Sequence, residues 1–187
     1  MEETELLHRL RLGDKAAFRE LVSLYSTKVL NLCYRFIPNQ KDAEDISQEV
    51  FIEIHQSILT FKGNSKLSSW IYRIAVTKCL DEIRKRKRKK RLVAAGKMLL
   101  LDDIAAWIGG GPMPDRKINE TESENLVLKV IDKLPDNQRV AFTLSKMEGY
   151  SNKEIAVIMD TSTLAVESLV AHAKKKVSSE LIRILQK

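Results

Sequence analysis

The sequence predicts an all-α protein in which two small helical domains are joined by a flexible linker. Most of the 187 residues fall into long stretches between glycines and prolines, and most of these stretches repeat apolar residues with the 3.6-residue period of a helix. No stretch sustains the alternation of apolar and polar residues that is typical of a half-buried strand. The cluster of glycine and proline at residues 109–114 lies among small and polar residues, which predicts a linker.

The apolar periodicity predicts seven helices. They cover about residues 15–37, 41–58, 67–88, 124–133, 136–147, 151–159 and 162–184. We expect an N-terminal domain over residues 1–91, a linker over residues 92–123 and a C-terminal domain over residues 124–187. Two apolar patches in the linker, at residues 98–101 and 104–108, are compatible with a short helix that docks on one of the domains.

The formal net charge of +7 comes from one segment. Residues 78–91 hold nine of the 32 Lys and Arg residues but only two of the 25 Asp and Glu residues. Residues 92–187 hold 13 of each kind and are neutral. The charge therefore indicates either a local anionic partner or a solvated block of charge, and it argues against a diffusely basic protein.

Composition excludes several functional classes. The longest run of aliphatic residues and Met covers four positions, too few to cross a bilayer, and the N-terminus is acidic, so we expect a cytoplasmic protein without membrane insertion. The cysteines and histidines are scattered at Cys33, Cys79, His8, His55 and His172. We therefore expect core cysteines, no metal and no cofactor. No catalytic triad, carboxylate pair or phosphate-binding loop indicates an enzyme.

The predicted helix 41–58 has two different faces. Its apolar stripe consists of Ala43, Ile46, Val50 and Ile54. Its opposite face carries Asp45, Gln48, Glu49, Ile52 and Gln56. An exposed Ile52 among acids suits docking onto a basic surface with an apolar centre. From spacing alone, a solvated acidic face is an equally good interpretation.

A polar loop over residues 61–66, with Gly63 at its turn, leads into the predicted helix 67–88. One sector of this helix carries Trp70, Arg73, Thr77, Arg84 and Arg88. Such a face suits single-stranded nucleic acid, because bases stack on the ring while cations follow the phosphates. The alternative is that Trp70 belongs to the core. Beyond about residue 86 the cations have only like charges as neighbours, so we expect the helix to fray unless phosphates neutralise it.

Residues 150–177 predict a helix-turn-helix. Ser151 and Glu154 have the spacing of a capping box, which begins a short helix. Asp160, which tolerates left-handed backbone, ends that helix in a tight turn before a longer helix. This order is typical of DNA-binding motifs, and an ordinary helical hairpin is the alternative.

The second helix of this motif carries the candidate DNA contacts. Polar side chains on its outward face can reach base edges or phosphates, and its positive N-terminal end suits a phosphate. The candidates are Ser162, Thr163, Ser168, His172, Lys174, Lys175 and Lys176.

Three segments, in this order, resemble the signature regions of bacterial sigma factors. Residues 42–53 resemble the polymerase-binding signature, and residues 61–75 resemble the promoter-melting segment. Leu134-Pro135 with the helix-turn-helix of 150–177 resembles the promoter-reading region. Because only these two sigma domains and a short linker are present, the chain resembles the extracytoplasmic-function (ECF) group of the sigma-seventy superfamily.

That resemblance, which covers about residues 12–91 and 126–181, implies a non-enzymatic transcription initiation factor that needs no cofactor. Such a factor binds core RNA polymerase, recognises promoter DNA and helps to melt it. Relatives of this group are usually held by an anti-sigma factor, so an anti-sigma partner is expected. The second hypothesis is a stand-alone helix-turn-helix transcriptional regulator, which would bind duplex DNA tightly without polymerase.

The resemblance also implies roles for individual residues. The helix that docks on polymerase corresponds to Asp45, Gln48, Glu49 and Ile52. The minus-ten and melting residues correspond to Phe61, Lys62, Gly63, Asn64, Ser65, Trp70, Arg73, Thr77 and Lys78, and the charge pattern adds Arg84 and Arg88. The second helix of the C-terminal motif corresponds to the reader of the minus-thirty-five element.

Overall fold

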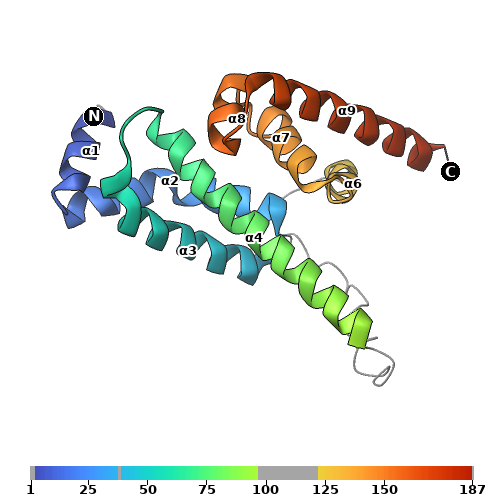
Figure 1. The fold of residues 1–187 in the computed structure, drawn as a ribbon, viewed down its shortest axis with the longest axis horizontal. Helices are drawn as coiled ribbons and strands as arrows, with labels where there is room; N and C mark the ends of the chain where they lie inside the picture. The colour runs from blue at the N-terminus through green and yellow to red at the C-terminus, as the bar shows by residue number, and fades with distance from the viewer. Residues whose placement is uncertain (1–2, 38, 97–121, 187) are drawn as a thin grey trace.

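The protein is described here from a computed structural model that covers residues 3–37, 39–96 and 122–186 (Figure 1). Every regular element in these ranges is helical, which confirms the predicted all-α class. The N-terminal helices are α1 (Glu3–Arg11), α2 (Lys15–Phe36), α3 (Gln40–Ser57), the short 3₁₀ helix η1 (Ile58–Thr60) and α4 (Leu67–Gly96). The C-terminal helices are α6 (Glu122–Ile131), α7 (Asp136–Lys146), α8 (Asn152–Met159) and α9 (Thr163–Leu185).

Helix α1 was absent from the predicted helices. It is short, and only two of its side chains, Leu6 and Leu10, are buried. These two residues are four positions apart and lie on one face of the helix, where they pack into the N-terminal core. Leu7 is partly buried against the same core, so the apolar signal of α1 consists of three leucines in a nine-residue helix.

The predicted fraying of the basic helix beyond residue 86 is wrong. Helix α4 continues to Gly96, and cations near residue 86 find acidic partners on other helices as well as on α4 itself. Arg86 pairs with Glu82 at 2.7 Å and with Asp42 of α3 at 2.8 Å. Lys87 pairs at 2.5 Å with Asp136, the first residue of α7. Tertiary packing thus supplies negative charge that the local sequence lacks.

Polar side chains begin several helices. The carboxylate of Asp14 accepts a hydrogen bond from the backbone amide of Ala16 at the start of α2. Ser151 and Glu154 form the predicted capping box at the start of α8, which confirms that prediction. The hydroxyl of Ser162 accepts a hydrogen bond from a backbone amide in the first turn of α9.

The helix-turn-helix has the predicted geometry. Asp160 ends α8 with a φ of 53°, and no other described non-glycine residue has a positive φ. The inner face of α9 buries Val166, Ala173 and Val177, whose spacings of seven and four residues place them on one side of the helix. The turn and the two helices are therefore encoded by local signals in the sequence.

The N-terminal core lies between α2, α3 and α4, with α1 packed on α2. Leu21, Leu32 and Ile54 are among its fully buried side chains. Cys33 of α2 and Cys79 of α4 are buried here, which confirms their predicted core packing. A hydrogen bond between the two thiols, together with burial, raises the pKa of Cys79 well above its ordinary value.

The C-terminal helices contribute to two cores. Val130, Ile131 and Phe142 pack with α9 in a small core of their own. Leu144 of α7 and Ile155 of α8 belong instead to the core that contains the N-terminal helices. Figure 1 shows α8 lying against α4, while the far end of α4 extends beyond the C-terminal helices. The two helical domains are therefore docked against each other through a continuous apolar layer.

Candidate nucleic-acid and polymerase interface

A pocket of about 300 Å³ opens where the polar loop of residues 61–66 meets the start of α4. We call it the α4 pocket. Its lining residues are Thr60, Phe61, Lys62, Asn64, Ser65, Trp70, Arg73 and Val157. Six of these eight belong to the melting segment expected from the sequence. The structure therefore gathers that segment around one hollow.

Two aromatic rings form the apolar part of the α4 pocket. The ring centroids of Phe61 and Trp70 lie 5.1 Å apart, with an angle of 36° between the ring planes. Phe61 is buried, and Arg11 of α1 donates a 2.5 Å hydrogen bond to its carbonyl oxygen. Trp70 is half-buried, so it contacts the core and also lines the pocket. The two interpretations of Trp70 are thus compatible.

The rim of the α4 pocket is basic and polar. Lys62 and Asn64 are exposed on the loop, and Gly63 makes its turn with a φ of 78°, a conformation that favours glycine. Arg73 projects from α4 and donates a 3.0 Å hydrogen bond from Nε to the carbonyl oxygen of Val157. A second guanidinium nitrogen of Arg73 donates to the same carbonyl and lies 3.3 Å from the carboxylate of Asp160.

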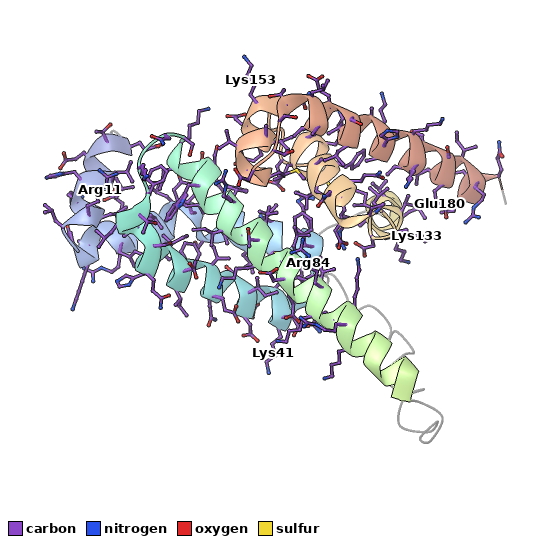
Figure 2. All side chains as sticks on the ribbon, in the orientation of Figure 1. Arg11, Lys41, Arg84, Lys133, Lys153 and Glu180 are labelled. Atoms are coloured by element: carbon purple, nitrogen blue, oxygen red, sulfur yellow. The ribbon has the colours of Figure 1, made fainter. Side chains whose placement is uncertain are left out.

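Besides Gly63, which makes the turn of the loop, four residues expected at the melting site do not line the α4 pocket. Thr77 is exposed on α4 and donates a hydrogen bond to a carbonyl one turn back on its own helix. Lys78 pairs with Glu53 of α3 at 3.4 Å. Arg84 pairs with an acid on its own helix, and Arg88 is exposed further along α4. Figure 2 shows Arg84 on the part of α4 that leads away from the pocket.

The expected polymerase-docking residues share one face of α3. Asp45, Gln48, Glu49 and Ile52 are all exposed. Their spacing of three, four and seven residues places them on one side of the helix. Ile52 is 57% exposed, which is unusual for an isoleucine and leaves an apolar centre within this acidic face.

The expected minus-thirty-five residues lie on the outer side of α9 and at its N-terminus. Ser168, His172 and Lys174 are exposed, whereas the hydroxyl of Ser162 is engaged in capping the helix. His172, Lys175 and Lys176 line a hollow of about 580 Å³ between α9 and α6. Figure 2 shows Lys133 and Glu180 meeting near this hollow, where their side chains form a 3.0 Å ion pair.

Two residues of the α4 pocket were not expected from the sequence. Thr60 ends η1, just before the loop, and its contribution could have been found by extending the motif by one residue. Val157 belongs to α8, more than 80 residues further along the chain, and no local pattern connects it with the loop. Its position depends on the docking of the two domains.

Two family models match the chain in the expected order. The Sigma-70 region 2 model matches residues 21–89, and the Sigma-70 region 4 model matches residues 124–177. The ECF RNA polymerase sigma factor SigW of Bacillus subtilis is 32% identical over 178 residues, an alignment that covers 94% of each chain. The chain belongs to the ECF sigma factors. This sigma factor is a transcription initiation factor that directs RNA polymerase to promoters, and it is not an enzyme.

Solved sigma factor structures share its fold. CnrH in complex with the cytosolic domain of CnrY gives a TM-score of 0.69 at 21% identity, covering 95% of this chain and 96% of CnrH. RpoE of Bartonella quintana, in complex with the anti-sigma factor NepR, gives 0.67 at 18% identity, covering 88% of this chain and 96% of RpoE. The sigma-factor interpretation is confirmed, and the stand-alone regulator is set aside.

Two further features of the described residues bear on the other expected classes. No group of three or more His, Cys, Asp or Glu side chains in these ranges could hold a metal ion. No single helix among them is long and apolar enough to cross a membrane, and only the sharply bent pair of α8 and α9 passes that test together.

Proposed function

We propose that the α4 pocket captures a base that flips out of the non-template strand when the promoter melts. The ring pair of Phe61 and Trp70 offers a stacking surface, and stacking on aromatic rings holds unpaired bases. Asn64 and Ser65 offer donors and acceptors for the edge of that base. The observation that carries the proposal is this ring pair in a pocket whose rim includes Lys62 and Arg73.

The exposed cations of α4 then follow the phosphates upstream of the pocket. Arg84 and Arg88 are four residues apart, so they lie one turn from each other on the helix. Exposed cations spaced along a helix neutralise phosphates without reading sequence. We assign to them the affinity of the promoter complex rather than its specificity.

The acidic face of α3 docks on core RNA polymerase. Asp45 and Glu49 supply charge, and Ile52 supplies an apolar centre that becomes buried on binding. Interfaces are commonly built from a desolvated apolar centre inside a polar rim. This arrangement favours the docking interpretation over a purely solvated face.

Helix α9 reads the minus-thirty-five element in duplex DNA. Ser168 and His172 are exposed near the middle of its outer face and can reach base edges in the major groove. The lysines that follow can contact phosphates. The free amides at the N-terminus of α9, near Thr163, suit a further phosphate.

The partners are core RNA polymerase and promoter DNA, which places the activity in the cytoplasm. Because RpoE of Bartonella quintana was solved with the anti-sigma factor NepR, we propose that an anti-sigma factor also binds this chain.

The test is run-off transcription with purified core polymerase on a library of promoter fragments. The wild-type chain should bind core and give promoter-dependent products, and Asn64→Ala and Lys62→Ala should reduce them while core binding is unchanged. These loop residues are exposed, so their replacement should not disturb the core. Lack of any product together with lack of core binding would overturn the proposal.

A pre-melted template separates the proposed roles. A bubble over the minus-ten element should restore transcription to the loop variants, because the melting step is bypassed. It should not restore transcription to Ile52→Ala, whose defect is in polymerase binding. Equal rescue of both kinds of variant would contradict the assignment of melting to the loop.

A further inference from the structure

Helix α1 holds both ends of the loop that forms the rim of the α4 pocket. At one end, a guanidinium nitrogen of Arg11 donates a 2.5 Å hydrogen bond to the carbonyl oxygen of Phe61. At the other end, the backbone amide of Leu67 donates a 2.7 Å hydrogen bond to the carboxylate of Glu3. Glu3 and Arg11 are the first and last residues of α1, so one short helix spans the whole loop.

The two residues that α1 holds are parts of the N-terminal core. Phe61 is buried, and its ring is one of the two that form the apolar part of the pocket. Leu67 is fully buried and begins α4, the helix that carries Trp70. Between these two residues, positions 62–64 of the loop are exposed to solvent. The shape of the pocket therefore depends on where the two ends of the loop are held.

Helix α1 is itself fixed to α2. Leu6 and Leu10 bury one face of α1 in the N-terminal core. Arg9 pairs with Asp14 at 2.8 Å and with Glu20 at 3.2 Å. Because Asp14 also caps α2, these ion pairs tie the end of α1 to the start of α2. The packed N-terminal helices thus set the position of the loop ends.

We propose that α1 is a brace that positions the melting loop for base capture, with Arg11 and Glu3 as its positioning residues. The proposal rests on the proposed role of the α4 pocket. Arg11 acts through Phe61, because holding the backbone of Phe61 also restrains the ring that lies 5.1 Å from Trp70. Glu3 acts through Leu67, whose amide begins the helix that carries Trp70. Neither Arg11 nor Glu3 is among the side chains that line the pocket, so their effect on a captured base is indirect.

The physical advantage of such a brace is preorganisation. A loop that is free to move loses conformational entropy when it closes on a base, and this loss opposes binding. A loop whose two ends are already held has given up part of that freedom before the base arrives. Loss of the brace should therefore weaken base capture, although every group that contacts the base is unchanged.

The test uses paired substitutions at each positioning residue. Arg11→Met removes the donor and keeps a long apolar side chain, whereas Arg11→Lys keeps a donor and the positive charge. Glu3→Ala removes the acceptor, whereas Glu3→Gln keeps an acceptor without the charge. Arg19→Met is the charge-matched control. Arg19 is likewise exposed and lines the same hollow of about 390 Å³ as Arg11, but it belongs to α2.

The readout is the affinity of the complex of polymerase and full chain for a pre-melted promoter that the wild type transcribes. Each non-template position of the minus-ten element is replaced in turn by an abasic site, and the position whose loss weakens wild-type binding most marks the captured base. Wild type should bind roughly 5- to 150-fold more weakly there, the range of one stacked base. In Arg11→Met and Glu3→Ala this penalty should be smaller by at least about 2-fold, the lower end of coupling between interacting groups. Arg11→Lys, Glu3→Gln and Arg19→Met should keep the wild-type penalty.

A purely structural or electrostatic role predicts a different pattern. Such a role lowers binding to the intact and the abasic template by the same factor, so an unchanged penalty in Arg11→Met and Glu3→Ala would overturn the brace. Amide hydrogen exchange of residues 62–66 in the full chain gives a second measurement. Exchange should be faster in Arg11→Met and Glu3→Ala than in Arg19→Met, and equal exchange in all three would also overturn the brace.

Failure of the proposed function gives a result of its own. If no abasic position weakens wild-type binding, base capture by the α4 pocket is wrong, and a role for α1 in base capture is wrong with it. If one position does weaken wild-type binding, base capture stands, and the variants then decide the brace alone.

Discussion

The carboxylate of Glu3 accepts a 2.7 Å hydrogen bond from the backbone amide of Leu67. Leu67 is the first residue of α4, so α1 supplies from a distance the acceptor that a Ser, Thr, Asp or Asn side chain ordinarily provides at a helix N-terminus. A helix that was not apparent from the sequence thus holds the start of the helix that carries the α4 pocket.

Replacement of Glu3 by alanine should destabilise the protein. We expect a loss of about 0.5–2 kcal/mol in the free energy of unfolding, the usual range for removing a capping side chain. Glu5→Ala is the matched control, because Glu5 is an exposed carboxylate in the same first turn of α1. Urea denaturation of both variants checks the prediction, and an equal loss in each would refute the capping role.

Ile52→Ala should weaken binding to core polymerase without weakening the fold. Ile52 is largely exposed in the free protein, so its replacement removes little from the core. If it becomes the apolar centre of the interface, we expect a loss of about 1–2 kcal/mol, or roughly 5- to 30-fold in affinity. Calorimetric titration with core polymerase measures this loss. Leu24→Ala on α2 is the control, since Leu24 is similarly exposed and should leave binding unchanged.

Arg84→Gln and Arg88→Gln should flatten the salt dependence of the promoter complex. For each duplex phosphate contact that is lost, the slope of the logarithm of the binding constant against the logarithm of salt concentration should fall by about 0.9. Filter binding of the polymerase complex at several salt concentrations gives the slope. Lys41→Gln, an exposed lysine at the start of α3, should not change it. An unchanged slope in the arginine variants would assign these cations to the solvated surface.

Glu154→Gln should have an effect on stability that depends on pH. Hydrogen bonds, first from Lys66 and then from Ser151, lower the pKa of Glu154 from 4.5 to about 2. A carboxylate with a lowered pKa stabilises the folded state above its unfolded pKa and loses this effect as pH falls toward its folded pKa. The urea midpoint of the variant should therefore lie below that of wild type near neutral pH, and the difference should shrink between about pH 4.5 and pH 2.

The contribution of Lys66 to this effect can be isolated by a double-mutant cycle. In a Lys66→Ala background, Glu154→Gln should change the midpoint less, because only the capping box remains. If Glu154→Gln changes the urea midpoint equally in both backgrounds, the capping box alone produces the stabilisation and the ion pair with Lys66 contributes nothing to it.

Local signals were enough to predict the helix-turn-helix and the polar loop. The capping box of Ser151 and the left-handed turn at Asp160 depend on residues next to each other in the chain, so their geometry follows from local chemistry. The same holds for Gly63, whose positive φ makes the turn of the loop. These elements have the positions that the motif spacing indicates.

Other features could not be predicted because they depend on distant partners. Asp42 and Asp136 are far from the basic run in sequence. The residues around position 86 therefore gave no sign that α4 continues beyond it. Lys78 was expected beside the melting loop, but Glu53 on α3 engages it. The contribution of Val157 to the α4 pocket likewise follows from the docking of the two domains. A pattern of neighbouring residues in the sequence does not reveal such a contact.

The length of α4 has a consequence for promoter architecture. A helix of 30 residues is about 45 Å long, so α4 separates the α4 pocket near its first residue from the point where the chain leaves its last residue. The end of α4 from which the chain continues toward the C-terminal domain therefore lies a helix length away from the pocket that we propose to capture a base. We therefore expect that tolerance to different spacings between the two promoter elements is adjusted by the residues between α4 and α6, and that promoters can vary in spacing without any change in how the base is held.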